Sequence, residues 1–354
     1  MSCIGVLYKS EKVSPQEPVD RLSTDLHINY WKLPRKCCGY NRFLDFGLFV
    51  NNANDINSLQ FYLPFHIEKS NLTDLGNTMA KDNLLSVLFN EKYKIETFPD
   101  APEYKHASSM SSENPKPDFW LYCLSNTDFD VEKLSKGTLI KVSIKTKPPE
   151  VKNKPREDEH ESSYNLYIRF RIRNLLENQL GFLESVSNDF FQNAFSKTEM
   201  VNMYINSLEE FDENDYKTLV SDYSFVSFNK IHFFFVGSSK DERVLGMTNY
   251  TDCRLLDSTK WHPYIGDNNP NNRKCLAYHW KKDGPVESSN FFFRTVFSNA
   301  NFWIILKYCL VIVVLGAISS YAASYIPIWN KQNATIEKTR TSNVIQEDNS
   351  KAIP

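Results

Sequence analysis

Cationic side chains recur at every second position in the segment Tyr164–Arg173. Successive side chains of a β-strand point to opposite faces, so the alternation predicts a strand with Leu166, Ile168, Phe170 and Ile172 on one face. Arg169, Arg171 and Arg173 then share the other face with Tyr167. Three guanidinium groups in a row are typical of a surface that binds phosphate or carboxylate groups.

The segment Thr138–Thr146 repeats this pattern, with Lys141 and Lys145 on its polar face. If the two segments pair as a long-looped hairpin, five cations share one face, and like charges opposite one another favour an anionic neighbour. We therefore expect a protein partner or an anionic ligand here, such as a lipid headgroup or nucleic acid. The alternative is a solvated face neutralised by nearby acids, namely Glu157, Asp158, Glu159, Glu161 or the run at 209–215.

A second set of side chains has the donor atoms for a metal ion. Cys275 and His279 are four positions apart, and Cys253 and His262 precede them. Structural zinc sites usually contain closer cysteine pairs, and Cys253 has no such companion. Cys253, Cys275 and His279 are thus weak metal candidates, and we expect buried thiols, a strand histidine and no cofactor.

Several enzyme classes are disfavoured by motifs that the sequence lacks. Its eleven glycines never come closer than the eight positions between Gly39 and Gly47, so phosphate-binding glycine loops are absent. Neither H-E-x-x-H nor G-x-S-x-G occurs. A non-enzymatic protein is therefore expected, with an enzyme on an unfamiliar scaffold as the remaining alternative.

The run Tyr308–Ile328 contains 21 residues without a charge. About 20 apolar residues are needed for a helix to cross a bilayer. Phe302, Trp303 and Trp329 flank the run, as aromatic residues do at membrane interfaces. We predict a transmembrane helix over 302–329, with the lipid bilayer as its partner, followed by a disordered polar tail over 330–354.

Small residues recur every four positions within this run, at Gly316, Ser320 and Ser324. Such spacing allows two helices to approach closely in lipid. A homo-oligomer that assembles through this stripe is one reading, and a monomeric anchor is the other.

Orientation is inferred from the other end of the chain. The apolar stretch Cys3–Tyr8 is shorter than a signal-peptide core, so residues 1–300 are expected in the cytoplasm with the helix in the cell inner membrane. The seven cysteines resemble no disulfide framework, which agrees with a reducing compartment.

Over the whole chain, 41% hydrophobic and 24% charged residues are ordinary globular values, and the net charge is only -2. Period-2 segments predict an α+β fold: an antiparallel, aromatic-rich β-sheet domain with inserted helices. A short helix is expected over Asp82–Phe89, a loop over 99–118 and a helical zone over Leu175–Phe195. The charged stretch 148–162 is a candidate boundary inside this domain.

Three functions remain open at this level. The first is a single-pass membrane protein whose cytoplasmic domain, as sensor, binds a partner or anionic ligand and couples it to the membrane. The second is an effector that oligomerises through its helix and perturbs the membrane, as in cell-suicide antiviral defence against phage. The third is a membrane-tethered enzyme.

Overall fold

The computed structural model describes residues 2–10, 23–35, 39–81, 84–113, 115–144, 147–149, 163–184, 196–221, 223–239, 242–246, 250–266, 274–298 and 302–350. The chain forms two compact units. We call the first the sheet unit, Met1–Asn188 with Lys197–Ser298. The second, Asp189–Ser196 with Asn299–Pro354, is the helix unit.

The first sheet contains nine described strands in the order β16-β19-β13-β1-β4-β10-β9, with β12 paired to β13 and β14 to β1. They are β1 (Ser2–Ser10), β4 (Ile56–Leu63), β9 (Phe129–Lys133), β10 (Thr138–Ser143), β12 (Gly181–Glu184), β13 (Ser196–Ile205), β14 (Ser224–Phe225), β16 (Glu242–Gly246) and β19 (Ser289–Ser298).

The second sheet contains ten described strands in the order β17-β18-β15-β2-β3-β11-β8-β7-β6, with β5 paired to β11. They are β2 (Thr24–Pro34), β3 (Tyr40–Val50), β5 (Leu72–Asp74), β6 (Tyr93–Thr97), β7 (Tyr104–Ser109), β8 (Phe119–Tyr122), β11 (Leu166–Ile172), β15 (Phe228–Ser238), β17 (Asp252–Leu256) and β18 (Cys275–Val286).

The fold is α+β and mostly sheet, as predicted, but its sheets are mixed rather than antiparallel. The pairs β1–β13, β2–β15 and β8–β11 are parallel. Partners such as β2 and β15 lie far apart in the sequence, and a long connection allows either direction. Strands from both sides of the predicted boundary at 148–162 pair with one another, so they belong to one unit.

The two sheets pack face to face around one aromatic-rich core. Phe61 of the first sheet contacts Phe46 and Phe170 of the second, with ring centroids 5.6 Å and 4.9 Å apart. The central strands, such as β2, β3, β4 and β11, contribute alternate residues to this core, which is the period-2 pattern read from the sequence. We call this side of each sheet its inner face.

A buried ion pair also joins the sheets through their inner faces. Nζ of Lys32 lies 2.6 Å from Oε2 of Glu199, and both side chains are fully buried. Arg42 donates to the same carboxylate from Nε, 3.4 Å away. Burial alone would raise the pKa of Glu199, but Lys32 and Arg42 hold it below its usual value.

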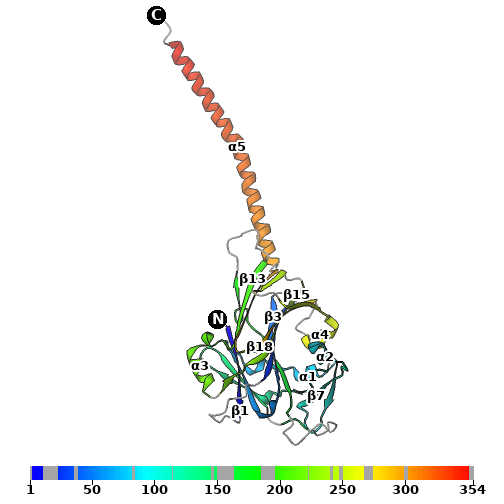
Figure 1. The fold of residues 1–354 in the computed structure, drawn as a ribbon. Helices are drawn as coiled ribbons and strands as arrows, with labels where there is room; N and C mark the ends of the chain where they lie inside the picture. The colour runs from blue at the N-terminus through cyan, green and yellow to red at the C-terminus, as the bar shows by residue number, and fades with distance from the viewer. Residues whose placement is uncertain are drawn as a thin grey trace. The chain divides into compact units, whose positions relative to one another are not determined.

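Short helices cover the outer faces, on opposite sides of the sheet unit (Figure 1). The ten-stranded sheet is covered by α1 (Gly76–Met79), α2 (Leu84–Phe89) and α4 (Ser258–Ile265), and the nine-stranded sheet by α3 (Glu213–Val220). Asp215 of α3 is buried and accepts bonds from Tyr62 Oη and the backbone N–H of Ser135. This carboxylate, from the acidic run at 209–215, therefore holds α3 on its sheet.

Two secondary-structure predictions were wrong and one was right. The helical zone Leu175–Phe195 contains β12, because Gly181–Glu184 pairs with β13, while 185–195 lies outside the described residues. The loop at 99–118 contains β7, which fills a place between β6 and β8. Helix α2 confirms the short helix, although 82–83 lie outside the described residues.

The helix unit contains α5, Phe302–Ser350. Its part Ile305–Ser324 is long and apolar enough to cross a membrane, with a mean hydropathy of 2.0 and none of it buried. The helix then continues through residues predicted as a disordered tail. There, the hydroxyls of Thr335 and Thr339 donate to backbone carbonyls four residues earlier, at 2.8 Å.

Candidate functional site

The predicted basic face of β11 is buried, so the prediction of an exposed cationic surface was wrong for Arg169 and Arg171. Both are 2% exposed. The alternation itself is correct, because Leu166 and Ile168 lie in the core between the sheets. The arginines lie on the outer face, where they contact α4, which is about 90 residues later in the chain.

Arg171 forms a two-pronged ion pair with Asp45, its partner across the β3–β11 ladder. Nε lies 2.6 Å from Oδ1, and Nη2 lies 2.9 Å from Oδ2. Trp31 Nε1 and Tyr264 Oη also donate to Oδ2, both at 2.8 Å. Four hydrogen bonds therefore converge on this buried carboxylate.

Arg169 instead donates to neutral oxygens. Its bonds run to Tyr264 Oη at 2.7 Å, Tyr167 Oη at 2.8 Å and Asn29 Oδ1 at 2.6 Å. Burial raises the pKa of Tyr264, so its hydroxyl keeps the proton that it donates to Asp45. We call these side chains the arginine network: Asn29, Asp45, Tyr167, Arg169, Arg171 and Tyr264.

The arginine network fixes α4 to the sheet, since Tyr264 accepts from one arginine and donates to the carboxylate that binds the other. Because Gly47 has no side chain, the Tyr167 hydroxyl and the Arg169 guanidinium can pack against its backbone. A Cβ at Gly47 would overlap the Tyr167 hydroxyl and lie 2.9 Å from Nη1 of Arg169. The network is thus an internal connection between α4, β2, β3 and β11, and its guanidinium groups are not a surface for an anionic ligand.

The other predicted cations do not join Arg169 and Arg171. Lys141 lies in the nine-stranded sheet, where Nζ is 2.7 Å from Oε2 of Glu132, because β10 pairs with β4 and β9 rather than with β11. Arg173 is exposed just beyond the end of β11, and Lys145 lies outside the described residues. The predicted face with five cations is therefore not formed.

The weak metal candidates also lie apart. Cys275 and His279 share one face of β18, but four residues of strand separate them by about 13 Å. Cys253 pairs with Tyr278, so it points to the opposite face from His279. Among the residues that the structure describes, no group of three or more ligating side chains could hold a metal ion.

His279 instead contacts His232, and His232 in turn contacts His27. Nε2 of His279 lies 3.0 Å from Nδ1 of His232, and the ring of His232 lies 4.9 Å from that of His27. We call His27, His232 and His279 the histidine ladder. His27 and His232 were not predicted as site residues, although the alternation Asp25, His27, Asn29, Trp31 indicates a polar row on one strand.

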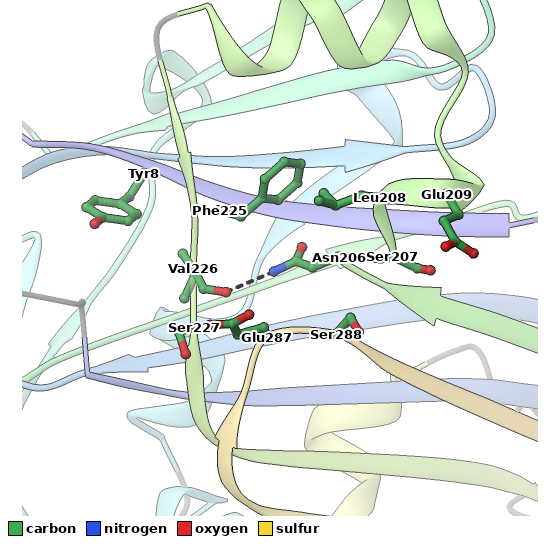
Figure 2. Close-up of a pocket in the computed structure, with 10 residues that line it drawn as sticks. All are labelled: Tyr8, Asn206, Ser207, Leu208, Glu209, Phe225, Val226, Ser227, Glu287 and Ser288. Carbon is green, nitrogen blue, oxygen red and sulfur yellow. Dashed lines mark hydrogen bonds between the residues drawn. The ribbon is translucent and has the colours of Figure 1, made fainter. Parts of the chain in front are cut away.

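The sheet unit contains a cavity of about 540 Å³ (Figure 2). Its walls come from β1, the turn after β13, β14 with the residues after it, and the β18–β19 hairpin. The residues that line it are Tyr8, Asn206, Ser207, Leu208, Glu209, Phe225, Val226, Ser227, Glu287 and Ser288. Carboxylates, hydroxyls and two aromatic rings thus face one cavity.

Asn206 is one of the residues that line this cavity. Its backbone is left-handed, with φ 50°, a conformation that asparagine adopts more readily than most residues. Its Oδ1 accepts from Val6 N at 2.8 Å, and its Nδ2 donates to Val226 O at 2.9 Å (Figure 2). The amide thereby joins the turn after β13 to β1 and to the segment after β14. Sequence patterns gave no signal for this site beyond the adjacent acidic run.

The small-residue stripe of α5 is exposed along the helix. Among the described residues, nothing apart from the adjoining residues and the helix's own backbone lies within 4 Å of a Cβ built at Gly316, and Ser320 and Ser324 are exposed as well. Ser324 Oγ donates to the carbonyl of Tyr321 at 2.6 Å. An internal bond of this kind lowers the cost of placing a hydroxyl in lipid.

No protein-family model matches the chain, and no curated protein matches it either.

Proposed function

We propose that the chain is a single-pass, non-enzymatic membrane protein whose sheet unit binds a ligand or partner and couples that event to the bilayer. The observation that carries the proposal is the stretch Ile305–Ser324 of α5, which is apolar along 20 residues and unburied. Each exposed apolar side chain costs free energy in water and gains it in lipid, at about 25 cal/mol per Å².

The sheet unit faces the cytoplasm in this proposal, with α5 in the cell inner membrane. Free thiols support that placement. Cys3 and Cys123 are buried free thiols, as expected for a protein kept in a reducing compartment. Burial also raises the pKa of Cys3 and Cys123 to about 12, so both stay protonated and unreactive.

The ligand site in this proposal is the cavity beside Glu209 and Glu287. Its carboxylates and the acidic residues of the adjacent turn disfavour anions, so the ligand class differs from the one expected at β11. Carboxylates, hydroxyls and the rings of Tyr8 and Phe225 suit a small ammonium compound or a basic side chain of a partner.

Reporter fusions at both ends of the full chain test the placement. We expect a cytoplasm-active reporter at the N-terminus and an export-active reporter at the C-terminus to give signal. The opposite pattern would show the reverse orientation. Signal from cytoplasm-active reporters at both ends would show that α5 does not cross the membrane.

A second candidate function follows from the exposed stripe Gly316, Ser320 and Ser324. Small residues on one helix face allow close packing of helices in lipid. In that case α5 assembles when the sheet unit is occupied and perturbs the membrane, as a cell-suicide effector does. Growth arrest and dye leakage on overexpression are the outcomes that distinguish it from a simple anchor.

A further inference from the structure

The histidine ladder crosses three adjacent strands on the outer face of the ten-stranded sheet. His27 of β2 lies directly opposite His232 of β15, and His279 of β18 lies one row further along. The rings of His232 and His279 are within 10° of parallel, with centroids 5.2 Å apart. With 3.0 Å between Nδ1 and Nε2, this is an N–H···N bond. Such a bond needs one ring nitrogen without a proton.

His27 is the innermost member of the ladder. Its Nδ1 is buried and has no hydrogen-bond partner among the described residues. Aromatic rings surround it, with centroids of Tyr167 at 5.7 Å and of Phe89, the last residue of α2, at 5.8 Å. A proton added to this ring would be poorly solvated.

Charges around the ladder are mixed, with cations closest to its inner end. Arg169 acts on His27, and Lys230 and Lys281 act on His232. The carboxylates lie at the periphery: Asp25 on β2, Asp252 opposite His279, and Asp283, whose Oδ1 is 2.7 Å from Nζ of Lys281. At His279, Asp252 raises the pKa of the ring, whereas Arg254 and Lys281 lower it.

We propose that the histidine ladder is a proton-sensitive switch: on acidification, protonation breaks the His232–His279 bond and loosens α2 from the outer face. Once both rings carry two protons, no acceptor remains between them. A charged His27 would face Arg169 and the apolar ring of Phe89, so the contact that seats α2 would open. This inference does not depend on the proposed function.

The titration of these groups fixes the direction of the switch. Burial lowers the pKa of His232 to about 4, with further lowering by His279 and Lys281, and burial also lowers the pKa of His27 and His279. A folded-state pKa below the ordinary value of 6.5 gives stability that is present above pH 6.5. That stability is lost as the pH falls toward 4. For His232 alone, the loss is about 30-fold in the opening equilibrium at pH 5.

Hydrogen exchange of the full chain in nanodiscs at pH 7 and pH 5, corrected for intrinsic rates, tests the switch. EDTA in both buffers excludes a bound metal as the titrating group. We expect exchange in α2, β2, β15 and β18 to accelerate about 30-fold or more at pH 5, while β4 and β10 change little. In His232→Gln the acceleration should fall several-fold, whereas His66→Gln, at an exposed position, should respond like the parent chain.

Equal acceleration in His232→Gln and the parent chain would overturn the switch. If the variant does not fold, imidazole NMR of the parent chain replaces it: titration of all three rings near pH 6.5 would overturn the proposal, and titration well below 6 would support it. No acceleration in these EDTA-containing buffers would also overturn it.

Discussion

The two faces of the ten-stranded sheet are built from alternate residues of the same strands, yet different interactions stabilise them. On β2, Leu26 and Ile28 lie in the core between the sheets, where apolar contact dominates. The outer-face residues His27 and Asn29 instead contact histidine and arginine side chains. Both faces are largely buried. The inner face is mainly apolar, apart from the Lys32–Glu199 pair, whereas the outer face combines the apolar contacts of α1, α2 and α4 with the arginine network and the histidine ladder.

The difference shows which changes each face can tolerate. An apolar core accepts substitutions of similar volume at modest cost. A buried polar network depends on every partner, because removing one leaves a charge or hydrogen-bonding group without compensation. The outer face should therefore be more sensitive to small chemical changes than the inner face is to changes of shape.

The largest effect is expected from Asp45→Asn. The substitution keeps the shape but leaves the buried guanidinium of Arg171 without its counter-charge, which costs about 3–5 kcal/mol. Urea unfolding of the full chain in detergent measures it. Glu132→Gln, which removes the partly exposed pair with Lys141, is the matched control and should cost about 1 kcal/mol or less. Equal losses in the two variants would show that the arginine network is not a structural unit.

Gly47→Ala comes next. One methyl group would displace the Tyr167 hydroxyl and Arg169, so we expect a loss of about 1–3 kcal/mol in the free energy of unfolding. The fluorescence of the six tryptophans, of which Trp31 lies beside Asp45, should shift in the folded state as well. The opposite result, an alanine variant as stable as the parent chain, would mean that the arginines do not need this gap.

On the inner face, Phe170→Leu should cost less than Asp45→Asn. Leucine retains apolar contact with Phe46 and Phe61 and leaves a smaller cavity than alanine would, so the cost should stay below that of a Phe→Ala truncation, about 3–5 kcal/mol. The same urea titration gives the value. If Phe170→Leu proved more damaging than Asp45→Asn, the contrast between the two faces would be reversed.

The smallest effect on the sheet unit is expected from Gly316→Leu with Ser320→Leu. The two positions are exposed on α5, so unfolding of the sheet unit should change by less than about 0.5 kcal/mol. If the stripe packs helices together, the variant should still insert into membranes but sediment as a monomer in detergent. Unchanged oligomer size would leave α5 as an anchor only.

Strand alternation could be read from the sequence, but the exposure of each face could not. For Tyr164–Arg173, the predicted strand and its inner-face residues are confirmed, but the predicted exposure of its outer face is wrong. The reason is distance along the chain: Asp45 lies 126 positions from Arg171, and Tyr264 lies 95 from Arg169. A row of arginines next to water and a row beneath α4 have the same local pattern.

Helix and loop errors had a similar origin. Leu176 and Leu180 are spaced as in a helix, but Leu176 is 63% exposed and Leu180 is 2% exposed. Pairing of Gly181–Glu184 with β13 therefore decided the structure of this segment. The apolar stretch of α5 was predictable because the run of 21 uncharged residues, Tyr308–Ile328, needs no tertiary partner to be recognised. The cavity near Asn206 was not, since its walls come from four separate segments.

Alkaline extraction of membranes tests the central claim, that α5 anchors the sheet unit in the bilayer, most directly. The full chain should remain in the membrane pellet at high pH. A variant with Val313→Arg and Leu315→Arg, each costing about 2.5–3.5 kcal/mol at the centre of the span, should move to the soluble fraction. It should also keep the urea midpoint of its sheet unit. Release of the unmodified chain by alkali, or equal retention of the arginine variant, would contradict the account.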